Sequence, residues 1–519
     1  MSPALRLFVL ILAPICGALP TRAAPEAALE RGAAIIDPPG LRELDDGRFA
    51  IGRLLWPERS ATIPLTSGQL FALSSMVPVR QAIDAEFDRY IARHKSSLPN
   101  ETIGVGAGFD FQLFDRAELN AADTRFVLAG IVNRMDRAYV DQASCGEIRL
   151  IYRLTRTSGS GGKAAVARLP MTLNLVLKAK GGHGIDRNGK AINCAEIARR
   201  WLAAGEWPLS GAPLAVKLQG EQGPLDLLGY ENIDRIETNL QIAHAPKSAA
   251  RDFRTDYLLK VFRYDAQARH FLEAPMENQI DRDRILADDG LKREFKSWLL
   301  EPKHLAEFDS GTVLIPEKFL AKGAIAATPV GFDASDLLPE FGLMQGEGAN
   351  PVFGEADIVA ALKKATADGI KLQNIRSVGG FERRLNDATC AGCHQTRGIG
   401  GFHFPGVDWM TPNPSNSTVV PASPHFFGDQ VRRRDILIAL RDGRKPDYSR
   451  GFASRPQLRG SSELAGTEYN DGWGAHCYAP GKPAAGNDAS FRAWTCAEGL
   501  ACQVAGKTSR MGMCFVKSR

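Results

Sequence analysis

The feature that most constrains this chain is the short stretch Cys390-Ala391-Gly392-Cys393-His394. It places two thiols three positions apart and an imidazole directly after the second thiol. With this spacing, one turn of backbone can present both sulfurs to the same ligand, and the histidine is held beside them. Three chemistries use such a pair: covalent attachment of haem, a structural or redox disulfide, and a metal site.

Covalent haem attachment uses every residue of the pattern. Each sulfur adds to one vinyl group of the porphyrin, and the adjacent imidazole nitrogen ligates the iron. A thioredoxin-like redox pair follows a buried strand, whereas residues 381–389 before this motif are polar and charged. A closed zinc site commonly uses two CxxC pairs, and the sequence has no second pair. The motif therefore predicts one covalent haem c on Cys390 and Cys393, with His394 as the axial iron ligand.

Residues 389–395 resemble the haem-binding site of c-type cytochromes. Two longer stretches, 133–154 with its Cys145-Gly146-Glu147 and 381–403, resemble a poorly characterised group of exported bacterial proteins that carry one such motif. The first resemblance implies covalent haem with His394 as the proximal ligand. The second implies no established activity.

Several residues are candidates for the sixth iron ligand. In small soluble cytochromes c the distal methionine usually lies several tens of residues beyond the motif. Met410 lies closer than that, which argues against an ordinary cytochrome c fold. Methionine would favour a raised reduction potential, histidine a lower one, and an open site would permit peroxide or small-gas chemistry. Met410 is ranked first, and the alternatives are His403 and His425.

The N-terminus is typical of a secretory signal peptide over residues 1–23. One positive charge precedes an apolar run at 7–19, and small residues follow at 21–24. The run is shorter than the roughly 20 residues that span a bilayer. Ile15 is too bulky for a lipoprotein signal at Cys16. The sequence thus predicts an exported protein, periplasmic or secreted, with no transmembrane segment after cleavage.

Export determines how the remaining cysteines are interpreted. Eight cysteines follow Cys16, and an even number in an oxidising compartment favours disulfides. A bridge between Cys145 and Cys194 and two bridges in the tail would use every cysteine outside the motif. The tail cysteines allow three pairings and follow the spacing C-x18-C-x5-C-x11-C: Cys477, Cys496, Cys502 and Cys514.

Hydrophobic periodicity predicts an α+β fold. We expect a large antiparallel-sheet domain over 24–345, a helical haem-bearing segment over 346–455, and a small disulfide-rich C-terminal module over 456–519. Predicted strands are 171–178 beside 149–154, and a hairpin of 257–264 with 269–273. Predicted helices are 194–204, 291–300 and 355–365, the last with Ile358, Val359 and Leu362 facing inward.

The large domain shows no recognisable catalytic pattern. The glycines before Lys163 lack the first glycine and the hydroxyl residue of a P-loop. Four acids are interpreted as surface or loop-capping carboxylates: Asp110, Asp115, Asp136 and Glu147. Four histidines outside any ligand motif are interpreted as ordinary exposed or core residues: His183, His244, His270 and His304.

The charge of the chain is mildly basic and dispersed, with a net value of +5. Its densest cluster, Arg432-Arg433-Arg434, precedes the apolar run 436–440. This arrangement predicts a solvated helix start and no nucleic-acid site. The positive charge would suit a weakly acidic redox partner protein, which it could steer toward the molecule.

Together these patterns favour an exported mono-haem c-type cytochrome-like protein that transfers single electrons. A di-haem peroxidase is disfavoured because it would need a second motif. The residues leave two alternatives open. One is a secreted binding or structural protein in which Cys390 and Cys393 form only a disulfide. The other is an enzyme that acts through the large domain and receives electrons through the haem, so enzymatic status stays undecided.

Overall fold

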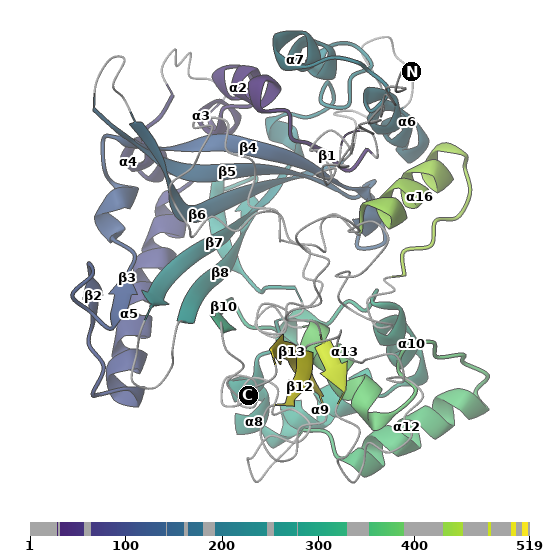
Figure 1. Ribbon diagram of the computed structural model, residues 1–519. Helices are drawn as coiled ribbons and strands as arrows, with labels where there is room; N and C mark the ends of the chain where they lie inside the picture. Colours follow the sequence, from purple (N-terminus) through teal and green to yellow (C-terminus); the bar gives the residue numbers. More distant parts are fainter. Residues whose placement is uncertain are drawn as a thin grey trace, which may run out of the picture.

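The computed structural model describes most of the chain between residues 32 and 449 and three short strands of the tail (Figure 1). The described residues are Leu29, 32–56, 64–141, 143–159, 165–179, 192–246, 254–277, 279–329, 352–388, 429–449, 476–478, 500–504 and 511–516. Within them no helix is both long enough and apolar enough to cross a membrane.

A large twisted sheet organises the first part of the chain. Its central strands are long, and each pairs with the next one along the chain. They are β4 (Thr124–Arg134), β5 (Glu147–Ser158), β6 (Ala165–Lys178), β7 (Ile233–Ala245) and β8 (Arg254–Asp265). Shorter strands pair with these central ones. β1 (Ala34–Ile35) lies beside β4, and both β9 (His270–Ala274) and β10 (Gly323–Pro329) lie beside β8. β3 (Phe111–Leu113) lies beside β7, and β2 (Ile103–Val105) lies beside β3. Among the described strands, β2 and β3 pair parallel and the others pair antiparallel.

The alternation at 171–178 explains why β6 lies at the centre of the sheet. Met171, Leu173, Leu175 and Leu177 are at most 1% exposed on one face, and Thr172 and Asn174 on the other are 8% and 6% exposed. β5 pairs with β6 as predicted, and β8 forms the predicted hairpin with β9. The antiparallel α+β architecture expected from the sequence is confirmed.

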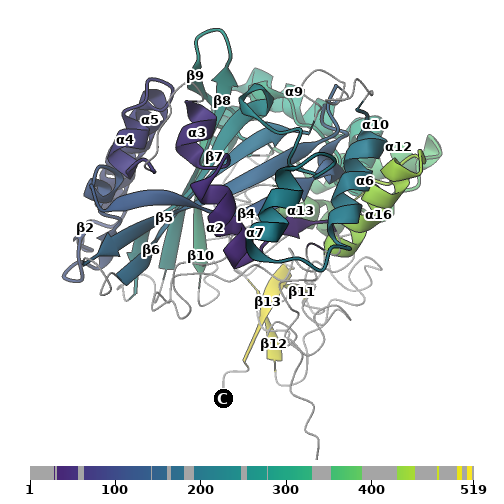
Figure 2. The same cartoon turned by 90° about the horizontal axis from the view of Figure 1, so that it is seen from above.

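Helices cover this sheet. Figure 2 shows α2 (Pro38–Asp46), α3 (Ile51–Leu55), α6 (Cys194–Ala204) and α7 (Gly211–Gln219) lying over it. Two more helices precede β2: α4 (Ser67–Phe71) and α5 (Val77–Ser97). α5 buries one face that recurs at helical spacing, through Val79, Ile83, Phe87 and Tyr90. The side chains between the sheet and these helices form the first hydrophobic core.

A second hydrophobic core lies outside the sheet, below it in Figure 1. It joins residues 280–320 to residues 352–385. Its helices are α8 (Arg282–Ala287), α9 (Asp289–Leu299), α10 (Pro302–Ser310), α12 (Glu355–Ala367) and α13 (Val378–Ala388). The predicted domain boundary at 345 falls outside the described residues, so it stays a prediction. The two stretches that flank this boundary nevertheless share one core.

One further helix and a small separate sheet complete the described chain. The helix α16 (Gln430–Arg441) packs against α6, and its Leu437 joins the first core. In the tail, β11 (His476–Tyr478), β13 (Met511–Val516) and β12 (Leu500–Val504) form a small antiparallel sheet in that spatial order. The tail therefore has strands of its own, in the region where the sequence predicts a separate disulfide-rich module.

The helix at 355–365 is confirmed, but its predicted inward face is partly wrong. Ile358 is fully buried and Leu362 is partly buried, whereas Val359 is 39% exposed. Ala361 and Ala365 share the buried face with Ile358. Positions three and seven residues after Ile358 fall on its face of a helix, and the next residue is turned away by about 100°.

This difference predicts unequal effects for two neighbouring aliphatic side chains. Ile358→Ala should lower the free energy of unfolding by about 2–5 kcal/mol, because it leaves a cavity in the second core. Val359→Ala is the matched control and should change it by less than about 0.5 kcal/mol. Urea unfolding of both variants measures the two values, and similar losses would contradict this orientation of α12.

Candidate functional site

The predicted haem residues lie in the one long stretch between α13 and α16. Cys390, Cys393 and His394, and the candidate sixth ligands Met410, His403 and His425, fall within 389–428, outside the described residues. What the structure describes is how the two ends of this stretch are held. The first end leaves α13 and the second enters α16.

The end at α13 is held by the second core. Phe381 is fully buried, and its ring lies 5.6 Å from that of Phe308 and 5.3 Å from that of Phe353. Leu385, one turn later, is 2% exposed. Buried Arg384 donates from Nη2 to the backbone carbonyl of Asp309. These contacts fix a helix that ends at Ala388, two residues before Cys390.

Asp309 at the end of α10 also fixes the turn that leads into α13. Its carboxylate accepts backbone N–H groups from Gln373 (2.9 Å), Asn374 (2.7 Å) and Ile375 (2.5 Å). A 5% exposed carboxylate with three such donors is well satisfied. α10, the turn at 373–375 and α13 therefore form one packed support for the start of the predicted haem segment.

The end at α16 is held by a first set of buried ion pairs. Arg432 donates from Nη2 to Oδ2 of Asp136 (2.8 Å), and Arg134 donates from Nε to Oδ1 of the same carboxylate (2.8 Å). Asp429, the residue before α16, accepts from Nε of Arg432 (2.7 Å) and from Nε of Arg433 (2.8 Å). Asp136 belongs to the short 3-10 helix Met135–Arg137 that follows β4. The network thus joins α16 to the end of a central strand.

A second set of charges continues from this point across the sheet. Glu147 at the start of β5 contacts Arg149 Nη2 at 3.0 Å, Arg235 Nη2 of β7 at 2.9 Å and Arg137 Nε at 3.2 Å. Glu237 of β7 accepts from Nε of Arg235 (2.7 Å). Arg137 also donates to Glu277, which follows β9 and precedes the second core. We call the two sets together the buried ion network: Arg134, Asp136, Arg137, Glu147, Arg149, Arg235, Glu237, Glu277, Asp429, Arg432 and Arg433.

Opposite charges hold Asp136, Glu147 and Asp429 ionised. Burial alone would raise the pKa of Asp136, but the positive charges of Arg134, Arg433 and Arg432 lower it well below the usual aspartate value. Burial opposes ionisation of Glu147 too, and Arg137, Arg235 and Arg149 lower its pKa well below normal. For Asp429, Arg432 and Arg433 outweigh burial and lower the pKa to about 2.

Two predictions about charged residues are therefore wrong. Asp136 and Glu147 are not surface or loop-capping carboxylates, since they are 2% and 7% exposed and are paired with arginines. The cluster does begin a helix, but only Arg434 in it is exposed: Arg432 is partly buried and Arg433 is buried, and Asp429 pairs with both.

For the other two acids, loop capping is confirmed. Asp110 accepts from the backbone N–H of Thr102 (2.8 Å), and Asp115 accepts from that of Ala117 (2.9 Å). Both are hydrogen bonds to backbone groups of nearby turns. The structural difference between the two pairs of acids is that Asp136 and Glu147 are paired with buried or partly buried arginines.

The sequence contains a local signal for the network. Glu147 and Arg149 alternate on β5, and Arg235 and Glu237 alternate on β7, so each pair lies on one face of its strand. Val176 of β6 is in register with both Arg149 and Arg235, which places the two pairs on either side of one strand. Opposite charges at i and i+2 in two strands of one sheet therefore indicate pairing across that sheet.

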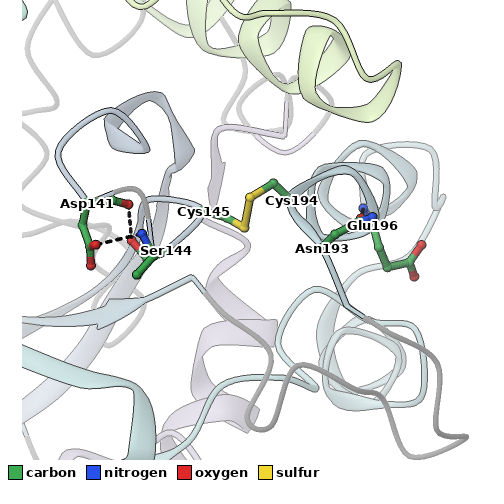
Figure 3. Close-up of a disulfide and its surroundings, with 7 residues drawn as sticks. Asp141, Ser144, Cys145, Asn193, Cys194 and Glu196 are labelled. Atoms are coloured by element: carbon green, nitrogen blue, oxygen red, sulfur yellow. Dashed lines mark hydrogen bonds between the residues drawn. A yellow bond between two sulfur atoms is a disulfide. The ribbon is translucent and has the colours of Figure 1, made fainter.

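The predicted disulfide between Cys145 and Cys194 is confirmed, with Cα atoms 5.2 Å apart (Figure 3). It connects the turn before β5 to the first residue of α6, whose N-cap Asn193 accepts from the backbone N–H of Glu196 (2.9 Å). Gly146 follows Cys145 with φ +96°, and a Cβ there would lie 2.6 Å from the carbonyl oxygen of Arg134. The bridge therefore braces the helix on which α16 packs.

The other predicted cysteines lie in the tail. Cys477, Cys502 and Cys514 fall on β11, β12 and β13, and Cys496 lies outside the described residues. Cys502 is disulfide-bonded and is in register with Cys514 on the neighbouring strand. The bridged state of Cys502 agrees with a stapled tail, and the pairing among the four cysteines stays a prediction.

The described histidines have ordinary surroundings. His304 bonds through Nδ1 to the carbonyl of Trp298 (2.8 Å), His270 to that of Ala268 (3.1 Å), and burial lowers the pKa of His244. His183 lies outside the described residues. Across the part of the chain that the structure describes, no group of three or more His, Cys, Asp or Glu residues is arranged to hold a metal ion.

Comparison with family models, with curated proteins and with solved structures finds no match for this chain. Its functional interpretation therefore depends on its own residues.

The buried ion network gives a prediction about stability and pH. Asp136→Asn should lower the free energy of unfolding by about 3–5 kcal/mol at pH 7, because it leaves buried guanidinium groups without their counter-charge. A carboxylate whose pKa is lower in the folded chain stabilises above its unfolded pKa of about 3.9, and this contribution is lost as pH falls toward the folded pKa. The difference between wild type and variant should therefore shrink below about pH 4.

The matched control for this measurement is Asp283→Asn. The Asp283 side chain is 93% exposed and lies 3.8 Å from Arg282, so its loss should cost less than about 0.5 kcal/mol. Denaturant unfolding between pH 3 and pH 8 gives both curves. A gap between wild type and Asp136→Asn that does not depend on pH would be inconsistent with an ionised Asp136.

The disulfide gives a second prediction. Cys145 and Cys194 are 49 positions apart, and closing a loop of this size stabilises a fold by about 2–4 kcal/mol. The double variant Cys145→Ala/Cys194→Ala should lose this amount in urea unfolding. A reducing agent should destabilise wild type more than the double variant. Equal losses of unfolding free energy would show that the bridge between Cys145 and Cys194 does not stabilise the fold.

Proposed function

We propose that this chain is an exported mono-haem c-type cytochrome-like protein that transfers single electrons. The observation that carries the proposal is the sequence Cys390-Ala391-Gly392-Cys393-His394. Cys390 and Cys393 would form the two thioether bonds, and His394 would be the proximal iron ligand. When bound, the haem supplies a one-electron redox centre.

The disulfide chemistry of the chain supports this assignment. Stable disulfides form in oxidising compartments such as the bacterial periplasm, and Cys145 and Cys194 form one. This agrees with the predicted signal peptide at 1–23, and an oxidising compartment outside the cytoplasm suits an exported c-type protein. Cys145 and Cys194 are bonded to each other, so neither is free to form a disulfide with Cys390 or Cys393.

The supports on either side of the haem segment are also consistent with the proposal. Residues that hold a redox cofactor must keep its ligands in a fixed orientation, and rigid elements do so better than free loops. The motif begins two residues after α13, a helix packed through Phe381, Arg384 and Leu385. The protein's own contribution would be to fix the attachment site at this helix and to set the potential through the sixth ligand, for which Met410, His403 and His425 remain candidates.

A second candidate function is a secreted binding or structural protein in which Cys390 and Cys393 form only a disulfide. The bridge at Cys145 and the bridged state of Cys502 favour this alternative, because they indicate a chain that uses disulfides structurally. In that case the bridge would close only the short loop from Cys390 to Cys393. The two functions differ in whether iron porphyrin is covalently attached.

Covalent haem is tested in protein purified from a host with cytochrome c maturation machinery. We expect a Soret absorption band that survives an acid-acetone wash, and a pyridine haemochrome spectrum of the thioether type. Cys390→Ala/Cys393→Ala should lose the band, because both attachment bonds are removed. The control is Cys145→Ala/Cys194→Ala, which removes two cysteines outside the motif and should keep the band.

A colourless wild-type protein from this host would contradict the cytochrome proposal and favour the disulfide alternative. Mass spectrometry of the unreduced protein then decides between the two states of the motif. Covalent haem adds the mass of the porphyrin to a peptide that contains Cys390 and Cys393. A simple disulfide removes two hydrogens from the same peptide.

A further inference from the structure

The helix α2 is tied to its surroundings by an aspartate at each end. Asp37, the residue before its first turn, accepts from the backbone N–H of Gly40 in α2 (2.8 Å) and from that of Gly211 in α7 (2.8 Å). In the last turn of α2, Asp45 accepts from the backbone N–H of Leu128 in β4 (3.0 Å). Asp45 therefore fastens the helix to the strand that it lies beside in Figures 1 and 2.

The two aspartates meet opposite ends of the helix dipole. Asp37 lies at the N-terminus, where unpaired N–H groups carry partial positive charge and favour an anion. Asp45 lies in the last turn, where unpaired carbonyl groups carry partial negative charge, and its side chain is only 3% exposed. The exposed carboxylate of Asp46 adds a negative charge beside it. Burial, the helix terminus and this neighbour all disfavour an ionised Asp45.

One cation offsets this penalty in part. Arg125 in β4 places Nη1 3.8 Å from Oδ2 of Asp45, which is too far for a hydrogen bond. Within the residues that the structure describes, the backbone of Leu128 and the guanidinium of Arg125 are the two partners of this carboxylate. The similarly buried Asp309, by comparison, accepts three backbone N–H groups. Asp45 is therefore a weakly compensated buried carboxylate.

The other ionisable groups around α2 bond elsewhere or are exposed. Burial, and then the charge of Asp45, raise the pKa of Tyr152 in β5, whose hydroxyl donates to the carbonyl of Phe49 (2.7 Å). Arg48 donates to backbone carbonyls between residues 225 and 228, and Nζ of Lys217 in α7 lies 4.3 Å from the centre of a tryptophan ring. The remaining charged side chains of α2 and α3 are exposed: Arg42, Glu43, Asp46 and Arg53.

Burial dominates the titration of Asp45 and raises its pKa to about 6, although the hydrogen bond from Leu128 and the charge of Arg125 act in the opposite direction. An aspartate in an unfolded chain has a pKa of about 3.9. Between these two values the folded chain binds a proton that the unfolded chain has released. The resulting stabilisation is complete below about pH 4 and is lost as the pH rises through about 6.

We propose that the contact between Asp45 and Leu128 is a pH-sensitive switch, which holds α2 against β4 more firmly when the carboxyl is protonated than when it is ionised. A neutral carboxyl keeps an oxygen that accepts from Leu128, and it removes the buried negative charge from the end of the helix. The switch does not depend on the proposed electron transfer, since its residues lie in the first part of the chain.

Amide hydrogen exchange of the full chain, followed by mass spectrometry between pH 5 and pH 8, tests this switch. Protection factors, which correct for the effect of pH on the chemical exchange rate, report how often a segment opens. They are compared for peptides that cover α2 and the first half of β4. In the wild type, protection should fall by about tenfold from pH 5 to pH 8. This is the change expected when the pKa of Asp45 is about 6 in the closed state and about 3.9 in the open one.

Three variants separate the Asp45 carboxyl from its surroundings. Asp45→Asn should remove the pH dependence, because the amide is neutral at every pH and keeps an oxygen for Leu128. Glu43→Gln is the matched control, since it removes an exposed carboxyl from the same helix and should reproduce the wild-type curve. Arg125→Gln should make the fall larger and extend it to higher pH, because loss of the cation raises the pKa of Asp45 further.

Each outcome decides for or against the switch. A fall in protection that occurs in the wild type, disappears in Asp45→Asn and extends to higher pH in Arg125→Gln supports it. Level protection in the wild type overturns it, and so does a fall that persists in Asp45→Asn. Should Asp45→Asn fail to fold, the curve of Arg125→Gln decides, and a curve identical to wild type contradicts the switch. None of these readouts involves haem, so their failure would leave the proposed function unaffected.

Discussion

The buried ion network is the constraint on which the arrangement of this chain depends. It collects arginines and carboxylates from the ends of β4, β5 and β7, from the segment before the second core, and from α16. Removing these charges from water is costly, and only close opposite partners offset the cost. Elements that are far apart in sequence are therefore held at one place, and a displacement of α16 would leave Asp136 and Arg432 unpaired in the interior.

This arrangement gives the proposed haem segment two different supports. At its start the attachment is hydrophobic and aromatic, through Phe381 and its ring contacts with Phe308 and Phe353. At its end the attachment is ionic, through Arg432 and Asp136. The disulfide at Cys194 adds a covalent brace to the helix under α16. A segment that carries a redox centre between two fixed ends would keep its ligands oriented, which one-electron transfer through a protein-held haem requires.

Much of the fold was predictable from the sequence because its signals are local. Alternation at 171–178 indicated β6, and the helix expected over 194–204 has those same bounds. Val359 was misplaced because a short apolar run does not say which residue faces the core. Asp136 and Glu147 were misplaced for a different reason. Their burial depends on arginines that include Arg432 of α16 and Arg235 of β7, far away in the sequence, and a carboxylate taken alone is most often solvated.

The sequence by itself determined the chemistry that is built into short stretches: the C-x-x-C-H motif, the alternating strands and the amphipathic helices. It also predicted the bridge between Cys145 and Cys194 from cysteine parity in a chain expected to be exported. Only the tertiary structure decided that 280–320 and 352–385 share a core, and that Arg432 meets Asp136 nearly three hundred residues away. The physical reason is range. Backbone propensity and covalent chemistry act between near neighbours, whereas the pairing of buried charges depends on which distant strands the packing brings together.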